Sequence, residues 1–231
     1  MIKSKIVVII PALNEEHSIG IVISHIPREY STNIIVADNG SSDKTVEIAK
    51  QYGAEVVIEN QRGYGSACLA GIAAAKLNQD DIVVFLDGDF SDFPEDMTDI
   101  LNTMKSKSLD LVIGSRTLGK ADSGALMPQA IFGNWLATRL LYFRYGFLFS
   151  DLGPFRAIRA SALNRINMRD KTFGWTVEMQ LKALKLGLRV GEVPVRYRKR
   201  IGVSKITGTV KGTILAGTKI LWTIFIHSLR K

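Results

Sequence analysis

The sequence predicts an α/β protein with a mainly parallel central sheet flanked by helices, and three observations lead to this prediction. β-Branched apolar runs form the expected strands, and they alternate with segments of helical spacing up to about residue 116. Such alternation is typical of a parallel sheet covered on both faces. The third observation is size, because 231 residues with 46% hydrophobic content suit one domain with a short appendage.

The predicted elements of the first half follow one another in order. “KIVVIIP” opens the chain as a strand buried on both faces, because its apolar residues are continuous rather than alternating. The helix after the second strand is expected to be capped by Ser42 or Asp43 and to end at Gly53. The further strands are expected at 34–38, 54–60, 81–87 and 110–116, and the helices at 14–26, 43–53, 65–76 and 94–106.

The alternation breaks beyond residue 120. A long apolar helix is expected, crossed by Arg139 and Arg144, and a final apolar helix carries Lys219 near its middle. The expected elements are a helix at 128–149, a loop, short strand and helical turn within 150–166, an amphipathic helix at 174–187, a strand at 189–200 and the final helix at 211–231.

The positive charge is concentrated at the C-terminal end of the chain. Nine basic and no acidic side chains follow Glu192, whereas residues 1–192 hold 21 basic and 22 acidic ones, so the tail accounts for the formal net charge of +8. A basic tail indicates an anionic partner, such as nucleic acid, phosphate groups or a membrane surface. We expect no nucleic acid, because the tail lacks interleaved stacking aromatics beyond Tyr197.

Carboxylates gather where the fourth strand ends, in “FLDGDFSDFPED”. Asp87 and Asp89 are hard oxygen ligands placed to bind Mg²⁺ or Mn²⁺ together with a diphosphate. The acids that follow, Asp92, Glu95 and Asp96, are explained by the start of the next helix. Ligands of parallel sheets bind outside the carboxyl ends of the strands. The same rim should therefore collect Asn14, Glu15, Asp38, the loop 60–65 and Arg116.

Seven motifs in chain order resemble a known enzyme family. “IIPALNEE”, “VADNGSSDKT”, “FLDGDFSDFPED” and “VIGSR” resemble the nucleotide-sugar half of inverting family 2 glycosyltransferases, which have the GT-A fold. “DLGPFRAIR”, “GWTVEMQLKA” and “YRKRIGVSKI” resemble the polyprenyl-phosphate sugar synthases, that is, the dolichyl-phosphate mannose and glucose synthases. The resemblance runs from about Lys5 to about Gly208 and implies a GT-A nucleotide-sugar-binding fold.

The resemblance also implies a reaction and a set of site residues. The expected reaction moves a hexose from a UDP- or GDP-linked sugar to a polyprenyl phosphate, with inversion, and Asp87 and Asp89 hold the metal and the diphosphate. One departure from the archaeal-type mannose synthase pattern is Ser91, which stands where that pattern has Gln. The residues expected around the nucleotide sugar are Pro11, Asn14, Glu15, Asp38, Gly63, Gly65 and Gly88, and those expected at the acceptor phosphate are Arg116, Arg200, Ser204 and Lys205.

Several of these residues have a second interpretation. Asp38 binds a base or ribose, or it caps the turn “DNGSSD”. Gly63 and Gly65 let the backbone approach the nucleotide, or they make a turn. “RGYGSACLAG” is not a dinucleotide fingerprint, because Cys68 stands where its third small residue belongs and the motif follows the third strand. A dehydrogenase is therefore not expected.

The acceptor decides which residues catalyse the transfer. A lipid phosphate is already ionised and needs no strong base, so Asp89, Arg116 and Arg200 would act by positioning and charge stabilisation. A hydroxyl acceptor of a glycolipid or polysaccharide requires a base, for which Asp151 and Glu178 are the candidates. Either could instead be structural. A hypothesis outside the enzymes is a non-catalytic sugar-nucleotide-binding subunit that recruits a membrane partner.

The chain is expected to divide into a catalytic domain, 1–207, and a C-terminal helix, 208–231. The catalytic domain would comprise a nucleotide-sugar half, 1–119, and an acceptor half, 120–207. The helix is polar at its centre, so it should lie in the interface of an anionic membrane rather than cross it, as a peripheral protein at the cytoplasmic face. Packing on the domain or on a membrane-protein partner is the alternative. Trp135, Phe143 and Phe147 could join this surface or belong to the core.

Overall fold

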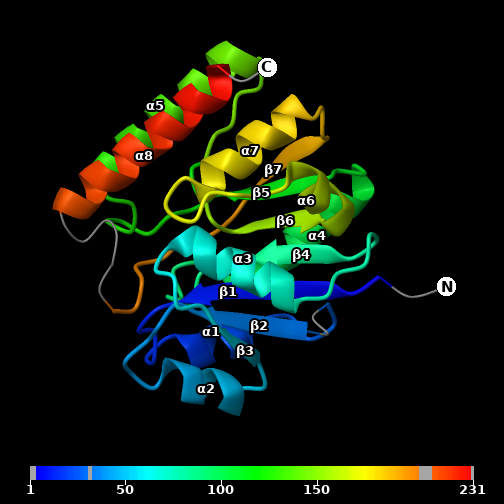
Figure 1. Ribbon diagram of the computed structural model, residues 1–231, viewed down its shortest axis with the longest axis vertical. Helices are drawn as coiled ribbons and strands as arrows, with labels where there is room; N and C mark the ends of the chain where they lie inside the picture. The colour runs from blue at the N-terminus through cyan, green and yellow to red at the C-terminus, as the bar shows by residue number, and fades with distance from the viewer. Residues whose placement is uncertain (1–3, 31–32, 203–209, 230–231) are drawn as a thin grey trace.

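A seven-stranded sheet runs through the middle of the molecule with helices on both faces (Figure 1). The structure is a computed structural model that describes residues 4–30, 33–202 and 210–229. The strands are β1 (Ile6–Ala12), β2 (Asn33–Asp38), β3 (Glu55–Ile58), β4 (Ile82–Phe85), β5 (Leu111–Ser115), β6 (Arg156–Arg159) and β7 (Val190–Pro194). The prediction of an α/β fold with a mainly parallel sheet is confirmed.

The helices lie close to the ranges expected from the sequence. The cap expected at Ser42 or Asp43 is wrong, because the second helix has Lys44 at its N-cap, although Asp43 accepts the backbone N–H of Thr45 at 3.0 Å. This helix ends at Gln51, two residues before Gly53, which has a φ of 87°. The helices are α1 (Ile19–His25), α2 (Thr45–Gln51), α3 (Tyr64–Ala74), the 3₁₀ turn η1 (Pro94–Asp96), α4 (Met97–Ser106), α5 (Pro128–Tyr145), α6 (Ala160–Ile166), α7 (Trp175–Lys185) and α8 (Val210–Leu229).

The order of strands in the sheet is β3-β2-β1-β4-β6-β5-β7. All neighbours pair in parallel except β6, which runs antiparallel to both β4 and β5. The carboxyl ends of β1, β2 and β4 therefore meet at one edge, where the loops after them can share a ligand.

Two hydrophobic cores lie on opposite faces of the sheet because successive strand residues point to opposite sides. Along β1, Val7 and Ile9 pack toward α3 and α7, whereas Val8 and Ile10 pack toward α1 and α4. Helix α3 lies very close to the sheet, since a Cβ at Gly71 would stand 2.5 Å from Cγ2 of Ile9. This closeness fixes the N-terminus of α3 beside the end of β1.

The strand expected at 189–200 is shorter than predicted. β7 ends at Pro194, and the chain continues as a segment that we call the C-terminal strap, residues 195–201. Val195 N still donates to Ser115 O at the end of β5, and the backbone of the strap after it bonds to loops. Arg198 N donates to Ser91 O and Ile201 N to Asp89 O, both at 2.9 Å, and Tyr197 N donates to Lys120 O at 2.9 Å. These bonds carry the basic run “RYRKR” across the acidic end of β4.

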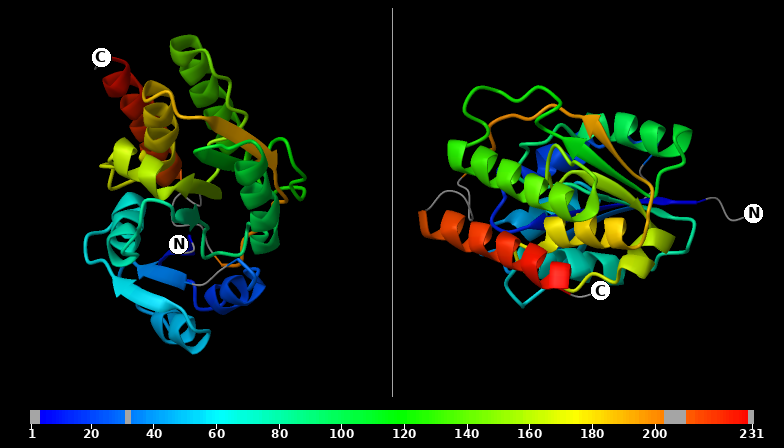
Figure 2. Two further views of the ribbon diagram at one scale, coloured as in Figure 1. Left: turned by 90° about the vertical axis from the view of Figure 1, so that its right-hand side faces the viewer. Right: turned by 90° about the horizontal axis from the view of Figure 1, so that it is seen from above.

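Helices α5 and α8 lie side by side at one end of the molecule (Figures 1 and 2). Their outward faces are rich in large apolar side chains. Those at least half exposed are Phe132, Trp135, Phe143, Leu215, Trp222 and Phe225. Within the described residues, no helix combines the length and the apolar character needed to span a membrane.

The close packing of α3 on β1 predicts an asymmetric response to one substitution. Gly71→Ala should lower the free energy of unfolding by about 1–2 kcal/mol, because the steric cost exceeds the gain in helix propensity. Gly133→Ala in α5 is the matched control, because a Cβ there would meet no atom within 4 Å. Chemical denaturation should show this variant unchanged or slightly stabilised. Equal effects at the two positions would contradict the packing.

Candidate active site

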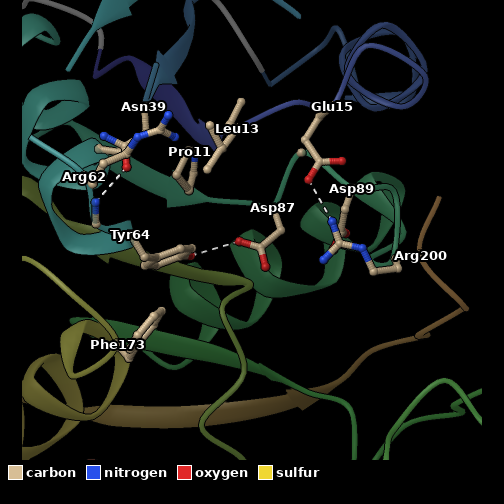
Figure 3. A pocket seen from close by; sticks show the side chains of 14 residues that line it. Pro11, Leu13, Glu15, Asn39, Arg62, Tyr64, Asp87, Asp89, Phe173 and Arg200 are labelled. Carbon is tan, nitrogen blue, oxygen red and sulfur yellow. Dashed lines mark hydrogen bonds and ion pairs between the residues drawn. The ribbon is translucent and has the colours of Figure 1, made fainter. Parts of the chain in front are cut away.

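A pocket of about 250 Å³ opens at the carboxyl ends of β1, β2 and β4 (Figure 3). The edge of the sheet is where the sequence placed the ligand site. The pocket's wall combines the loop after β1, the start of α3, the acidic loop after β4, one side chain from the loop before α7 and one from the C-terminal strap. Its lining residues include Pro11, Leu13, Glu15, Asn39, Arg62, Gly63, Tyr64, Asp87, Gly88, Asp89, Phe173 and Arg200.

Arg200 supplies positive charge to this acidic rim. Its Nη2 donates to Oε1 of Glu15 at 2.7 Å, and its Nη1 lies 3.1 Å from Oδ2 of Asp89. Glu15 comes from the loop after β1 and Asp89 from the loop after β4, so one guanidinium joins two loops across the pocket. Since the three side chains are largely buried, this pairing is screened less than a surface ion pair.

The strap that carries Arg200 is itself held by two other arginines. The Arg198 guanidinium lies 3.8 Å from the ring centre of Phe90 and 3.4 Å from that of Phe93. The Arg196 guanidinium binds Asp96, with its Nε 2.9 Å from Oδ1. Cation–π and ionic contacts therefore occupy these two side chains, which leaves Arg200 as the arginine of the strap that faces the pocket.

Asp87 and Tyr64 form a hydrogen-bonded pair in the wall of the pocket. The Tyr64 hydroxyl donates to Oδ1 of Asp87 at 2.9 Å. Burial and the neighbouring Asp89 carboxylate raise the pKa of Asp87 to about 7. Burial and the nearby Asp87 likewise raise the pKa of Tyr64 well above its ordinary value. Negative charge at this position is therefore unfavourable until a cation joins it.

Ser91 and Asp92, which follow Asp89, lie next to the same acidic residues. Ser91, which departs from the family pattern, donates its hydroxyl to Oδ1 of Asp89 at 2.6 Å and so orients that carboxylate. Asp92 is 1% exposed, and neither of its carboxylate oxygens accepts a hydrogen bond from the described residues. Burial together with Asp87 and Asp89 raises the pKa of Asp92 well above its usual range. Asp92 is thus part of the acidic cluster as well as the approach to η1.

The carboxylate oxygens at the pocket suit a divalent metal ion that also binds phosphate oxygens of a ligand. Among the described residues, no three His, Cys, Asp or Glu side chains converge as a metal site. Asp87 and Asp89 instead offer two carboxylates beside an open pocket, and the guanidinium on Asp89 marks a place that accepts a cation. Mg²⁺ is commonly held by one or two carboxylates, with phosphate oxygens and water completing its shell. The residues present fit such an ion.

Arg116 and Asp151 form a closed pair next to the pocket rather than in its wall. Nε and Nη2 of Arg116 donate to the two oxygens of Asp151 at 2.7 and 2.8 Å, and the backbone N–H of Arg116 donates at 2.9 Å. Burial alone would lower the pKa of Arg116, but the Asp151 carboxylate raises it above its ordinary value. Asp151 is fully buried. The pair is therefore neutral as a whole, and it locks the Arg116 side chain at the end of β5.

Glu178, the other candidate base, does not line the pocket at the strand ends. It is 2% exposed and borders a second cavity between α8 and the loop before α7. Its carboxylate accepts the backbone N–H of Asp170 at 2.8 Å and pairs with Lys182 at 2.7 Å. These contacts are those of a structural carboxylate that holds the loop before α7.

The predicted nucleotide residues divide into two groups. Asp38 accepts the N–H groups of Gly40 and Ser41 through Oδ2, both at 3.0 Å, so it does cap its turn. Asn14 has a positive φ of 53° and accepts the N–H of Ser42 at 2.8 Å, which joins the loops after β1 and β2. Pro11, Glu15, Gly63, Asp87, Gly88 and Asp89 line the pocket, whereas Asn14, Asp38 and Gly65 lie outside its lining, and Ser204 and Lys205 lie outside the described residues.

Gly63 and Gly65 approach protein backbone rather than open space. A Cβ on Gly63 would stand 2.0 Å from Lys171 O, and a Cβ on Gly65 would stand 2.0 Å from Asp170 O. The loop before α7 therefore packs directly on the start of α3. This contact brings Phe173 into the pocket wall beside Tyr64 (Figure 3).

Sequence reasoning did not name several residues of the wall, among them Asn39, Arg62, Tyr64 and Phe173. Asn39 accepts the N–H of Gly63 at 2.7 Å and donates to Glu59 O, so it ties β2 to the loop before α3. Arg62 and Tyr64 belong to the loop 60–65, which the sequence did assign to the rim without naming them. Phe173 had no such signal, because it reaches the pocket only through the packing of a distant loop.

Comparison with known proteins gives a consistent result. The profile of the family described as “Glycosyl transferase family 2” matches residues 7–166. An uncharacterized glycosyltransferase of Mycobacterium tuberculosis is 35% identical over 213 residues, which cover 91% of this chain and 94% of that protein. A dolichyl-phosphate hexose transferase of Haloferax volcanii is 30% identical over 201 residues, which cover 86% and 85% of the two chains.

A solved structure supports the fold. Glucosyl-3-phosphoglycerate synthase from Mycobacterium tuberculosis, crystallised with Mn²⁺, UDP and phosphoglyceric acid, superposes with a TM-score of 0.78. The alignment covers 98% of this chain and 79% of that protein at 22% sequence identity. At this identity the likeness shows the fold alone, and the predicted GT-A fold is confirmed.

The raised pKa of Asp87 predicts a pH-dependent stability of the metal-free protein. Because the folded protein holds this proton up to about pH 7 and the unfolded chain releases it near 4, unfolding becomes easier as pH rises between these values. Asp87→Asn stays neutral, so it should gain about 2 kcal/mol over the wild type between pH 5 and pH 8. Urea denaturation in EDTA measures this difference.

The control for this experiment is Asp99→Asn, which changes an exposed carboxylate on α4. It should follow the wild type across the pH range. If Asp87→Asn also follows the wild type, the acidic cluster does not hold the proton as described.

Proposed function

Since this chain belongs to glycosyl transferase family 2, we propose that it transfers a hexose from a nucleotide-diphosphate sugar to a polyprenyl phosphate, with inversion at the anomeric carbon. The observation that carries the donor half is the pocket at the strand ends, which Asp87 and Asp89 line together with Arg62 and the loop after β1. A nucleotide diphosphate combines a flat base, a ribose and a strongly anionic group, which such a pocket can accommodate.

The charges of the pocket suit the leaving diphosphate. Asp87 and Asp89 would hold Mg²⁺ or Mn²⁺, and such an ion would neutralise the charge that develops on the diphosphate as the sugar bond breaks. A metal ion on Asp89 would repel the Arg200 guanidinium, which lies 3.1 Å from Oδ2 of that carboxylate. We therefore expect Arg200 to turn away from Asp89 in the loaded enzyme, toward the acceptor phosphate, while Glu15 remains within its reach.

The acceptor half of the proposal rests on the absence of a suitable base among the candidates. Asp151 is held by Arg116 on both oxygens, and Glu178 holds backbone N–H groups beside the second cavity. A phosphate acceptor is already ionised and can attack without a base. Arg200 lines the pocket and would supply positive charge for such a group, whereas Arg116 next to the pocket is paired with Asp151. The dolichyl-phosphate hexose transferase relative supports a lipid phosphate.

We further propose that α5 and α8 rest on an anionic membrane surface, which would bring the pocket near a lipid acceptor. Trp222 and Phe225 stack on the exposed face of α8, and Phe132 and Trp135 lie together on α5. Phe143 is 82% exposed, whereas Phe147 turns inward onto Phe149. Aromatic side chains beside a basic tail match the interfacial pattern, in which apolar insertion adds to attraction by anionic headgroups.

A transfer assay tests the proposed reaction. UDP-glucose, UDP-galactose and GDP-mannose are offered with Mn²⁺ to a short-chain polyprenyl phosphate, and products are identified by mass. We expect a glycosyl polyprenyl phosphate, with turnover reduced about a hundredfold or more in Asp89→Asn because a carboxylate at the diphosphate is lost. Asp99→Asn serves as the exposed control and should keep full activity.

The same assay includes 3-phosphoglycerate and a free glycoside as competing acceptors. If product forms from 3-phosphoglycerate alone, the acceptor is a small phosphorylated compound and not a lipid phosphate. Product from the glycoside alone would return Asp151 and Glu178 to consideration as bases. Unchanged turnover in Asp89→Asn would contradict the proposal that Asp89 binds the metal ion.

Vesicle co-sedimentation tests the membrane surface. Binding should rise with the fraction of anionic lipid and fall with added salt, because the charged part of the attraction is screened. Replacing Trp222 and Phe225 together by Ser should weaken binding by roughly tenfold or more, since two exposed rings lose their insertion. Ile58→Ser on β3, at the opposite end of the sheet, is the matched control. Binding that ignores both lipid charge and the two rings would contradict the proposal.

A further inference from the structure

Lys219 is a charged residue in the middle of the apolar helix α8, and its half-buried side chain reaches the loop before α7. Its Nζ lies 2.9 Å from Oδ2 of Asp170, whose side chain is 7% exposed. Lys219 also borders the second cavity, between α8 and the loop before α7. The polar centre of this helix therefore serves a contact within the molecule. An apolar residue there would leave the Asp170 carboxylate without its cation.

Asp170 organises the loop before α7, residues 169–174, which we call the bridging loop. Its second oxygen, Oδ1, accepts the backbone N–H of Thr172 at 2.7 Å and that of Gly174 at 3.2 Å. Its own backbone N–H is held by Glu178 at 2.8 Å. One carboxylate thus fixes the path of the bridging loop with one oxygen and binds α8 with the other.

The bridging loop is in close contact with both of its neighbours, with α8 at Gly174 and with α3 at Lys171. On one side, a Cβ on Gly174 would stand 2.6 Å from Oγ1 of Thr223 in α8. On the other side, Ser66 N in the first turn of α3 donates to Lys171 O at 3.0 Å, and Gly63 and Gly65 pack against the loop's carbonyls. The second cavity separates α8 from other parts of the loop, so a shift of α8 toward the loop would act on it at Gly174, next to Phe173.

The same loop contributes Phe173 to the donor pocket. The ring lies in the pocket wall near Tyr64, whose hydroxyl binds Asp87 (Figure 3). Phe173 is adjacent to Gly174, which α8 contacts, and to Thr172, which Asp170 binds. The contact between α8 and the bridging loop is thus connected to the wall of the pocket within a few residues.

We propose that Lys219 and Asp170 are positioning residues for the donor pocket, which couple the seating of α8 to the place of Phe173. This inference rests on the proposed function only in taking the pocket to be the nucleotide-sugar site. The pair touches no substrate and acts through the bridging loop. Its consequence is that anything that shifts α8, such as contact with another surface, changes the affinity for the donor.

Calorimetric titration with UDP-glucose and GDP-mannose in the presence of Mn²⁺ tests the pair in the full chain. Lys219→Met keeps the side chain's length and removes its charge, and it should weaken binding of the donor that the wild type takes by at least about fivefold. Lys219→Arg should restore most of the affinity. In a Phe173→Ala background, Lys219→Met should have no further effect, because it acts through that ring.

Lys185→Met is the matched control. Lys185 on α7 donates to His227 O of α8, so this variant removes the same charge from a contact with the same helix, but outside the bridging loop. It should bind the donor like the wild type. If Lys219→Met unfolds the chain, which a melting curve would detect, Asp170→Asn tests the same pair from the other side.

The outcomes separate this inference from the proposed function. A wild type that binds neither nucleotide sugar overturns the assignment of the pocket, and the inference with it. A wild type that binds, with Lys219→Met and Asp170→Asn binding equally well, overturns the inference alone. Equal losses in Lys219→Met and Lys185→Met would also overturn it, because they would show general loosening of α8. Additive losses from Phe173→Ala and Lys219→Met would contradict the route through the ring.

Discussion

Carboxylates collected at the end of a buried strand repel one another, and the site depends on how that repulsion is relieved. In this structure the guanidinium of Arg200 relieves it, by lying between Glu15 and Asp89. The strap that delivers Arg200 is held by backbone bonds to the acidic loop itself. Burial and like charge leave Asp87 with a raised pKa even so, which marks it as a position where a further cation is favourable.

The topology of the sheet explains why these groups meet. Parallel pairing of β1 with β2 and β4 brings three strand ends to one edge, and the antiparallel β6 joins this half to β5 and β7. The chain can then return from β7 across the edge as the strap. Two packing contacts hold the far wall in place, namely α3 on β1 and the bridging loop on the start of α3. The pocket is thus a product of the core as well as of its own side chains.

The sequence was informative where function depends on local pattern. Alternating strands and helices predicted the sheet, and acids at a strand end predicted Asp87 and Asp89 as rim residues. It was less informative where a residue's role depends on a distant partner. The bond between Ser66 and the bridging loop joins groups 105 residues apart, so Phe173 could not be placed in the pocket. Glu178 belongs to a motif that resembles the family, yet its carboxylate contacts the loop before α7. The basic run at 196–200 was predicted as part of a strand, but it lies outside the sheet because its backbone bonds to loops.

We propose that the acidic cluster exchanges the Arg200 guanidinium for a metal ion when the nucleotide sugar binds. Anomalous diffraction from crystals grown with Mn²⁺ and UDP tests this claim directly. We expect a manganese peak between Asp87 and Asp89, with the Arg200 guanidinium moved away from Asp89. A manganese peak elsewhere, or bound UDP with Arg200 still joining Glu15 to Asp89, would contradict it.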